Sequence, residues 1–72
     1  MNAMDTVFAN TNFADEAENY IWHGITERDK IEADVRECLK EYNATEDDVQ
    51  EYTDNVYEAV LYAMRRENDI LK

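Results

Sequence analysis

The chain has 72 residues, of which 18 are Asp or Glu and 7 are Lys or Arg, so the formal net charge is −11. This length allows one small domain, which we expect to span residues 1–72, and excludes a parallel α/β sheet. One Cys and one His exclude a disulfide framework and a Cys/His zinc module. The charge argues against direct binding of nucleic acid, and no apolar run approaches the roughly 18 residues of a membrane span.

The first eleven residues show no clear periodic pattern. Met4, Val7 and Phe8 fit one turn of helix, a flap over the rest of the domain, or a frayed end. We therefore interpret residues 1–11 as a short N-terminal segment that is either flexible or flap-like.

A first helix is predicted over residues 13–23. Asn12 is a suitable N-cap, and Gly24 suits the left-handed conformation that ends many helices. Between them, apolar residues recur on one helical stripe. These are Phe13, Ala17, Tyr20 and Ile21.

A second helix is predicted over residues 27–42. Thr26, with Asp29 three positions later, predicts a capping box, and Asn43 ends the helix. The predicted core stripe consists of Ile31, Val35, Cys38 or Leu39, and Tyr42. A free, buried Cys behaves as a small hydrophobic residue and is typical of a reducing compartment, so we expect a cytoplasmic protein.

A third helix is predicted over residues 46–66. Thr45 is its N-cap, and the three acids that follow suit the positive end of the helix dipole. Its stripe consists of Val49, Tyr52, Val56, Ala59 or Val60, Ala63 and Met64. No segment alternates with a period of two. The sequence therefore predicts an all-α fold, a small antiparallel three-helix bundle.

No residue pattern indicates catalysis or a metal. General acid–base catalysis needs carboxyl groups in different environments within a pocket, whereas nearly every acid here lies on a predicted polar face. The acidic run 46–48 lacks the Gly and Glu spacing of an EF-hand, and a Gly-rich phosphate loop is missing. We expect neither an enzyme nor a cofactor or metal.

Carboxylates form two stripes on the predicted polar faces. At 100° per residue, the first stripe lies opposite the core side of the third helix and consists of Asp47, Glu51, Asp54 and Glu58. The second, on the second helix, consists of Glu27, Asp34, Glu37 and Glu41. The first stripe has no base three or four positions away, so its like charges repel. It is either a solvated face or the binding site of a basic partner.

Several aromatic and apolar residues lie off the core stripes. They are Trp22, Tyr57, Leu61 and Tyr62, residue types that include those dominating binding hot spots. Three interpretations remain open. The residues pack within the domain, they anchor a partner beside the first acidic stripe, or they form a homodimer through the third helix.

Two functional hypotheses follow. In the first, the chain is a nucleic-acid mimic that occupies the basic groove of a nuclease or other nucleic-acid-binding effector. In size, charge and helicity it resembles small acidic helical phage proteins that block restriction or CRISPR nucleases. That resemblance is one of general type and is not carried by a family motif. In the alternative, the chain is a structural interaction module, a helical homodimer or adaptor whose acidity only keeps it soluble.

Overall fold

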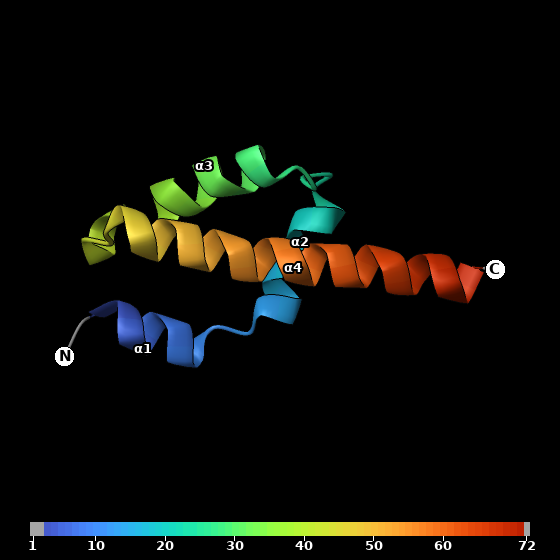
Figure 1. Cartoon of the computed structure of the whole chain (residues 1–72), viewed down its shortest axis with the longest axis horizontal. Coiled ribbons are helices and arrows are strands. Elements are labelled where there is room, and N and C mark those ends of the chain that lie inside the picture. Colours follow the sequence, from blue (N-terminus) through green and yellow to red (C-terminus); the bar gives the residue numbers. More distant parts are fainter. Residues whose placement is uncertain (1–2, 72) are drawn as a thin grey trace.

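The structure is a computed structural model that describes residues 3–71, with side chains described for residues 3–66. Within residues 3–71 there are four α-helices, one 3₁₀-helix and no strand, which confirms the predicted all-α class (Figure 1). The elements are α1 (Ala3–Asn10), α2 (Phe13–Trp22), α3 (Arg28–Cys38), the 3₁₀-helix η1 (Lys40–Tyr42) and α4 (Glu46–Leu71).

The long helix α4 organises the molecule. Its 26 residues, at about 1.5 Å each, give a length of about 39 Å, close to the longest dimension of 46 Å. In Figure 1, α1 and α3 lie on opposite sides of its first half, and α2 crosses behind its middle. The last turns of α4 extend beyond the three shorter helices. One helix therefore contributes both to the packed part of the fold and to a projecting end.

Helices α3 and α4 run in opposite directions. Arg28 at the start of α3 pairs with Asp54, and Arg36 near its end pairs with Glu46, so residue numbers rise along one helix as they fall along the other. The reversal passes through η1 and Asn43, which has a φ of 56°. Asn tolerates this left-handed conformation better than most residues, because its short polar side chain bonds to the local backbone.

The N-terminal segment supplies a fourth α-helix where the sequence predicted three. The Met4 side chain is only 1% exposed and belongs to the core. The Phe8 ring centroid lies 5.9 Å from that of Tyr52 on α4 and 6.4 Å from that of Phe13 on α2. Residues 3–10 thus pack on the rest of the chain through one apolar side, whereas residues 1 and 2 of the segment lie outside the described residues.

Both ends of α2 form at the residues that the sequence predicted. The Asn12 side-chain oxygen accepts hydrogen bonds from the backbone N–H groups of Ala14 and Asp15, at 3.1 and 3.2 Å. Gly24 has a φ of 76°, and the next N–H, that of Ile25, donates to the Tyr20 carbonyl at 2.8 Å. This is the Schellman arrangement that satisfies the last carbonyls of a helix.

The start of α4 is a capping box. The Asp48 N–H donates to the Thr45 hydroxyl at 3.1 Å, and the Thr45 N–H donates back to the Asp48 carboxylate at 3.0 Å. The sequence predicted such a box at Thr26 instead, and that prediction is wrong. The residue that caps α3 is Glu27, and its side chain makes no capping hydrogen bond.

The predicted second helix is also too long, because α3 ends at Cys38 and the chain continues as η1. The helical stripe is not maintained past that point. Leu39 is buried, but Cys38 and Tyr42 are exposed, contrary to the prediction that they belong to the core. On α4, Met64 was likewise predicted to be buried and is 39% exposed.

The core is the set of apolar side chains that the four helices turn toward one another. Among residues 3–66, ten buried apolar residues form it: Met4, Ala17, Tyr20, Ile31, Val35, Leu39, Val49, Tyr52, Val56 and Val60. Thr53 is buried among them, and its hydroxyl has no hydrogen-bond partner within residues 3–66. Seven of these ten apolar residues lie on the predicted stripes outright, and Leu39 and Val60 were each one of two candidates. Met4 and Thr53 were not assigned to a stripe.

Candidate binding surfaces

Helix α3 neutralises one edge of the first acidic stripe. Arg28 Nη2 lies 2.6 Å from Asp54 Oδ1, and the same nitrogen donates to Gln50 Oε1 at 2.8 Å. Arg36 forms a bidentate pair with Glu46 and also contacts Glu32. The sequence showed no base within one turn of the stripe on α4, but the tertiary fold supplies one from another helix.

These pairs change the electrostatics of that edge. Hydrogen bonds from Arg36, and then from Gln50, lower the pKa of Glu46 to about 2. The reciprocal effect raises the pKa of Arg36, and the hydrogen bond to Asp54 raises the pKa of Arg28. Both guanidinium groups therefore remain charged at neutral pH, and so does the Glu46 carboxylate. The α3 side of α4 is therefore a paired surface with little charge left to attract a partner.

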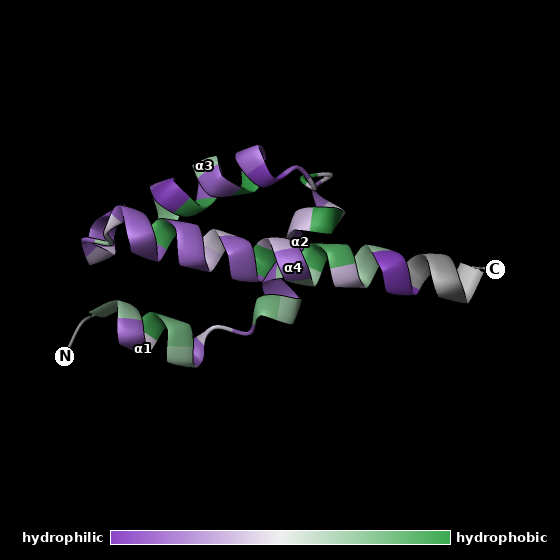
Figure 2. Cartoon of the chain, viewed as in Figure 1, coloured by the Kyte–Doolittle hydropathy of each residue, from purple (hydrophilic) through white to green (hydrophobic). Residues whose placement is uncertain are grey.

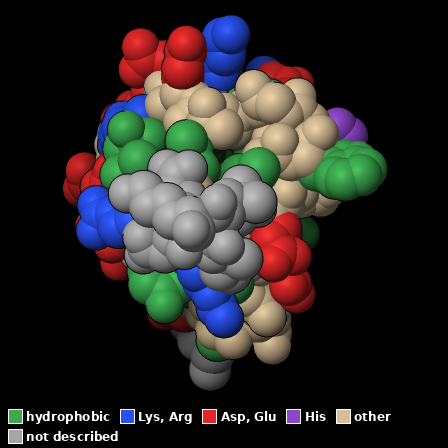
Figure 3. All heavy atoms as spheres, turned by 90° about the vertical axis from the view of Figure 1, so that its right-hand side faces the viewer, with side chains coloured by type: hydrophobic (Ala, Val, Ile, Leu, Met, Phe, Trp, Pro, Cys, Tyr) green, Lys and Arg blue, Asp and Glu red, His purple; other side chains and the backbone are tan. Residues whose placement is uncertain are grey.

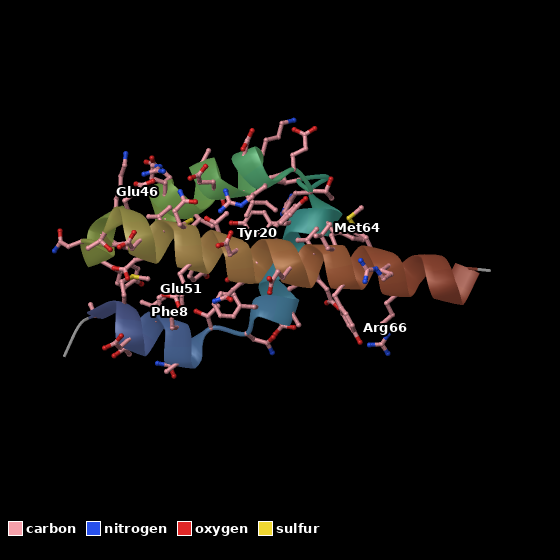
Figure 4. The ribbon with its side chains drawn as sticks, viewed as in Figure 1. Phe8, Tyr20, Glu46, Glu51, Met64 and Arg66 are labelled. Carbon is pink, nitrogen blue, oxygen red and sulfur yellow. The ribbon has the colours of Figure 1, made fainter. Side chains whose placement is uncertain are left out.

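Three acids of the first stripe are left without a base. Asp47, Glu51 and Glu58 are exposed, and none forms an ion pair with any of residues 3–66. Figure 4 shows Glu51 on the side of α4 toward α1, whereas Glu46 lies on the side toward α3. We refer to Asp47, Glu51 and Glu58 as the acidic face. It is the part of the predicted stripe whose charge the fold does not compensate.

The second predicted stripe is dispersed by the fold. Asp34 accepts a 2.6 Å hydrogen bond from the Tyr20 hydroxyl of α2. Glu37 pairs with Lys40 at 2.9 Å, and Glu41 lies on η1 beyond the end of α3. These three residues therefore do not share one helical face.

The aromatic and apolar residues predicted as anchors fall on two sides of the acidic face. Tyr57 is half-buried against the core, and Leu61, one turn later on the same side, is 40% exposed. Tyr62 is 67% exposed and lies about 140° around the helix from Tyr57. Trp22 is 87% exposed, so it does not pack within the domain. The predicted cluster of Tyr57, Leu61 and Tyr62 is thus divided.

In the fold, each part of the divided cluster lies near another apolar residue: Met64 is near Tyr57 and Leu61, and Trp22 is near Tyr62. The sequence did not predict these neighbours. Met64 lies two turns after Tyr57 on the same side of α4, while Arg66 points to the opposite side (Figure 4). Tyr62 and Trp22 line a groove of about 820 Å³ between α2 and α4. Figure 2 shows the change along α4, whose visible face is mostly hydrophilic in the first half and more hydrophobic before the end. No periodic signal within one helix predicts a groove made by two.

A smaller cleft of about 380 Å³ separates α2 from α3 and includes His23, Asp34 and Cys38. Burial, and then the charge of Asp34, raises the pKa of the Cys38 thiol. A raised pKa reduces the thiolate fraction and with it the nucleophilicity. Among residues 3–66, no three His, Cys, Asp or Glu side chains are grouped so as to hold a metal ion.

None of the helices within residues 3–71 combines the length and the apolar composition needed to cross a membrane. Comparisons of the chain with protein-family models, with curated proteins and with solved structures find no match.

Proposed function

We propose that this chain is a small protein-binding inhibitor whose acidic face occupies the basic groove of a nucleic-acid-binding protein. The observation that carries the proposal is the division of the α4 carboxylates. The bases of α3 pair with Asp54 and Glu46, and Asp47, Glu51 and Glu58 remain exposed and unpaired within residues 3–66. A partner with Lys and Arg in a groove would supply the missing positive charge.

The spacing of the face supports mimicry of a nucleic acid. From Asp47 to Glu58 there are eleven residues, which at about 1.5 Å each span about 16 Å along one straight helix. A nucleic-acid backbone presents several phosphates over that length. Helices α2 and α3 both pack on α4, and we propose that the three act as a small antiparallel bundle that positions the face.

Apolar residues beside the face supply the short-range part of the binding energy. Leu61 is 40% exposed and lies less than one turn after Glu58 on α4. Complementary charge mainly accelerates encounter, whereas buried apolar contacts mainly slow dissociation. The proposed biological role is a cytoplasmic counter-defence protein of the phage type, directed against a restriction or CRISPR nuclease.

A pair of matched charge reversals tests the proposal. Glu51→Lys with Glu58→Lys reverses the acidic face, and Glu37→Lys with Glu41→Lys makes the same change in net charge, from −11 to −7, on α3 and η1. Asp54 is left intact because a lysine there would repel Arg28 and disturb the fold. The immobilised chain captures partners from a host lysate at about 50 mM salt, and each captured protein is then purified.

The first double variant is expected to lower the association rate of the purified partner at least about tenfold and to reduce its salt dependence. The second double variant should change the rate far less. Double-stranded DNA should compete with the parent chain for the same partner. Equal effects of the two variants, or binding that DNA does not affect, would show that the acidic face is a solvated surface.

The second candidate is a structural interaction module, favoured by the exposed Leu61, Tyr62 and Met64 side chains at the projecting end of α4. Under this alternative, reversal of the acidic face would leave partner binding unchanged. Replacement of those apolar residues would abolish it.

A further inference from the structure

The groove between α2 and α4 is open, apolar and formed around small side chains. Ala14 of α2 and Ala59 and Ala63 of α4 line it, so a bulky side chain can enter without meeting large neighbours. Trp22 and Tyr62 also line it and are 87% and 67% exposed. One surface therefore carries both an apolar depression and a large projecting ring that could fill such a depression.

The groove is bordered by two opposite charges that have no partner within residues 3–66. Glu18 lies on the α2 wall and Arg66 on the α4 wall, and neither forms an ion pair there. Arg65 and Arg66 are the Lys or Arg residues of this part of the chain that remain unpaired. The end of α4 is therefore the region where a second, equally acidic molecule meets the least repulsion.

A two-fold symmetric interface requires a surface that is complementary to itself. The groove meets this requirement in shape, through Trp22 and the alanines, and in charge, through Glu18 and Arg66. A basic protein partner fits it less well, because Arg66 would face another base. Figure 3, which looks onto the end of α4, shows hydrophobic side chains on several sides of that end and acidic ones toward the edges.

We propose that a second copy of this chain occupies the groove, forming a symmetric dimer in which each Trp22 packs into the groove of the other molecule. Glu18 of each copy pairs with Arg66 of the other. The acidic face precedes the groove along α4: Glu58 lies one turn before Tyr62, and Asp47 and Glu51 lie nearer the start of the helix. The dimer rests on the residues of the groove and not on the proposed binding of a nuclease by the acidic face.

The chain contains a single Trp, which makes its own fluorescence a direct measure of the proposed contact. Sedimentation of the full chain from about 1 μM to about 1 mM is expected to show a monomer–dimer equilibrium. This range covers dissociation constants that differ by about a thousandfold, and each tenfold corresponds to about 1.4 kcal/mol of binding free energy. Over the same range the Trp22 emission should shift to shorter wavelength as the indole leaves water. A chain that stays monomeric at about 1 mM would overturn the proposal.

Charge exchange between two variants tests the arrangement itself. Glu18→Arg places two bases at each proposed contact, and Arg66→Glu places two acids there, so each variant alone should dimerise at least about tenfold more weakly than the parent. An equimolar mixture should regain dimerisation, because each contact of the mixed dimer joins one base and one acid.

The matched control is Arg65→Glu, which makes the same charge change on a residue that does not line the groove, and it should leave dimerisation within about twofold of the parent. Circular dichroism of each variant confirms that the helices are intact. Failure of the mixture to recover the dimer, or an equal loss with Arg65→Glu, would overturn the Glu18–Arg66 pairing. Dimerisation that persists in Trp22→Ala would overturn the role of the groove.

Discussion

The two halves of α4 belong to one helix and differ in nearly every contact. From Glu46 to Glu58, the inward side chains are buried, a capping box begins the helix, and α3 supplies two Arg partners. After Val60, every described side chain up to Arg66 is at least partly exposed. The difference follows from length, because helices of 8, 10 and 11 residues cannot cover one of 26. The first half carries the stability, and the second half offers surface.

The largest expected effect on stability is the difference between replacing a methionine in the packed core and replacing one on the exposed half of α4. Met4 of α1 is 1% exposed against the core, whereas Met64 of α4 is 39% exposed. Met4→Ala should lower the free energy of unfolding by about 2–5 kcal/mol, and Met64→Ala by less than about 1 kcal/mol. Urea unfolding of both variants measures the difference. Equal effects would mean that α1 contributes nothing to the packing of the first half.

The buried hydroxyl of Thr53 is a local weakness within the packed half. It is fully buried and has no hydrogen-bond partner in the described part of the chain, a condition that costs about 1–3 kcal/mol. Thr53→Val keeps the shape of the side chain and removes the polar atom, so it should raise the free energy of unfolding by about 1 kcal/mol. An increase in the urea midpoint with an unchanged slope would confirm this gain. A lower midpoint would contradict it.

The capping box at the start of α4 gives a third test, with Thr26 as its natural control. Thr45→Ala removes the hydroxyl that accepts from the Asp48 N–H and should cost about 1 kcal/mol. The sequence suggests the same role for Thr26, but α3 begins without a side-chain cap. Thr26→Ala should therefore cost much less. A comparable loss of stability in thermal unfolding of both variants would show that the cap of α4 has no special role.

The smallest expected effect concerns acid. The folded-state pKa of Glu46 is lowered to about 2 from an ordinary value of 4.5, so the unfolded chain binds this proton more readily. The Arg36–Glu46 pair therefore stabilises the fold above pH 4.5, and that contribution is lost as the pH falls toward 2. Glu46→Gln should flatten the decline of stability between about pH 6 and about pH 2.5. If the free energy of unfolding of Glu46→Gln falls with decreasing pH as steeply as that of the parent, the Arg36–Glu46 pair does not stabilise the first half.

Local sequence signals predicted the elements well where one residue decides the backbone. Asn12, Gly24 and Thr45 mark helix ends as expected, and α2 and the start of α4 lie within one residue of their predicted positions. The prediction failed for α3, which ends four residues earlier than its apolar period indicates. The buried Leu39 and the turn at Asn43 were both predicted, but the apolar period does not show that the α-helix ends at Cys38 and the chain continues as η1.

The binding surfaces divide in the same way between sequence and tertiary structure. Composition and the 3.6-residue period were enough to place Asp47, Glu51 and Glu58 on the outer side of one helix, because a helix places residues by spacing alone. Whether each carboxylate is paired depends on residues far away in the chain. Arg28 reaches Asp54 across 26 positions, and Trp22 and Tyr62, forty positions apart, line one groove, only because the helices pack. Spacing along one helix is a local property, whereas ion pairs and grooves between helices exist only after the chain has folded.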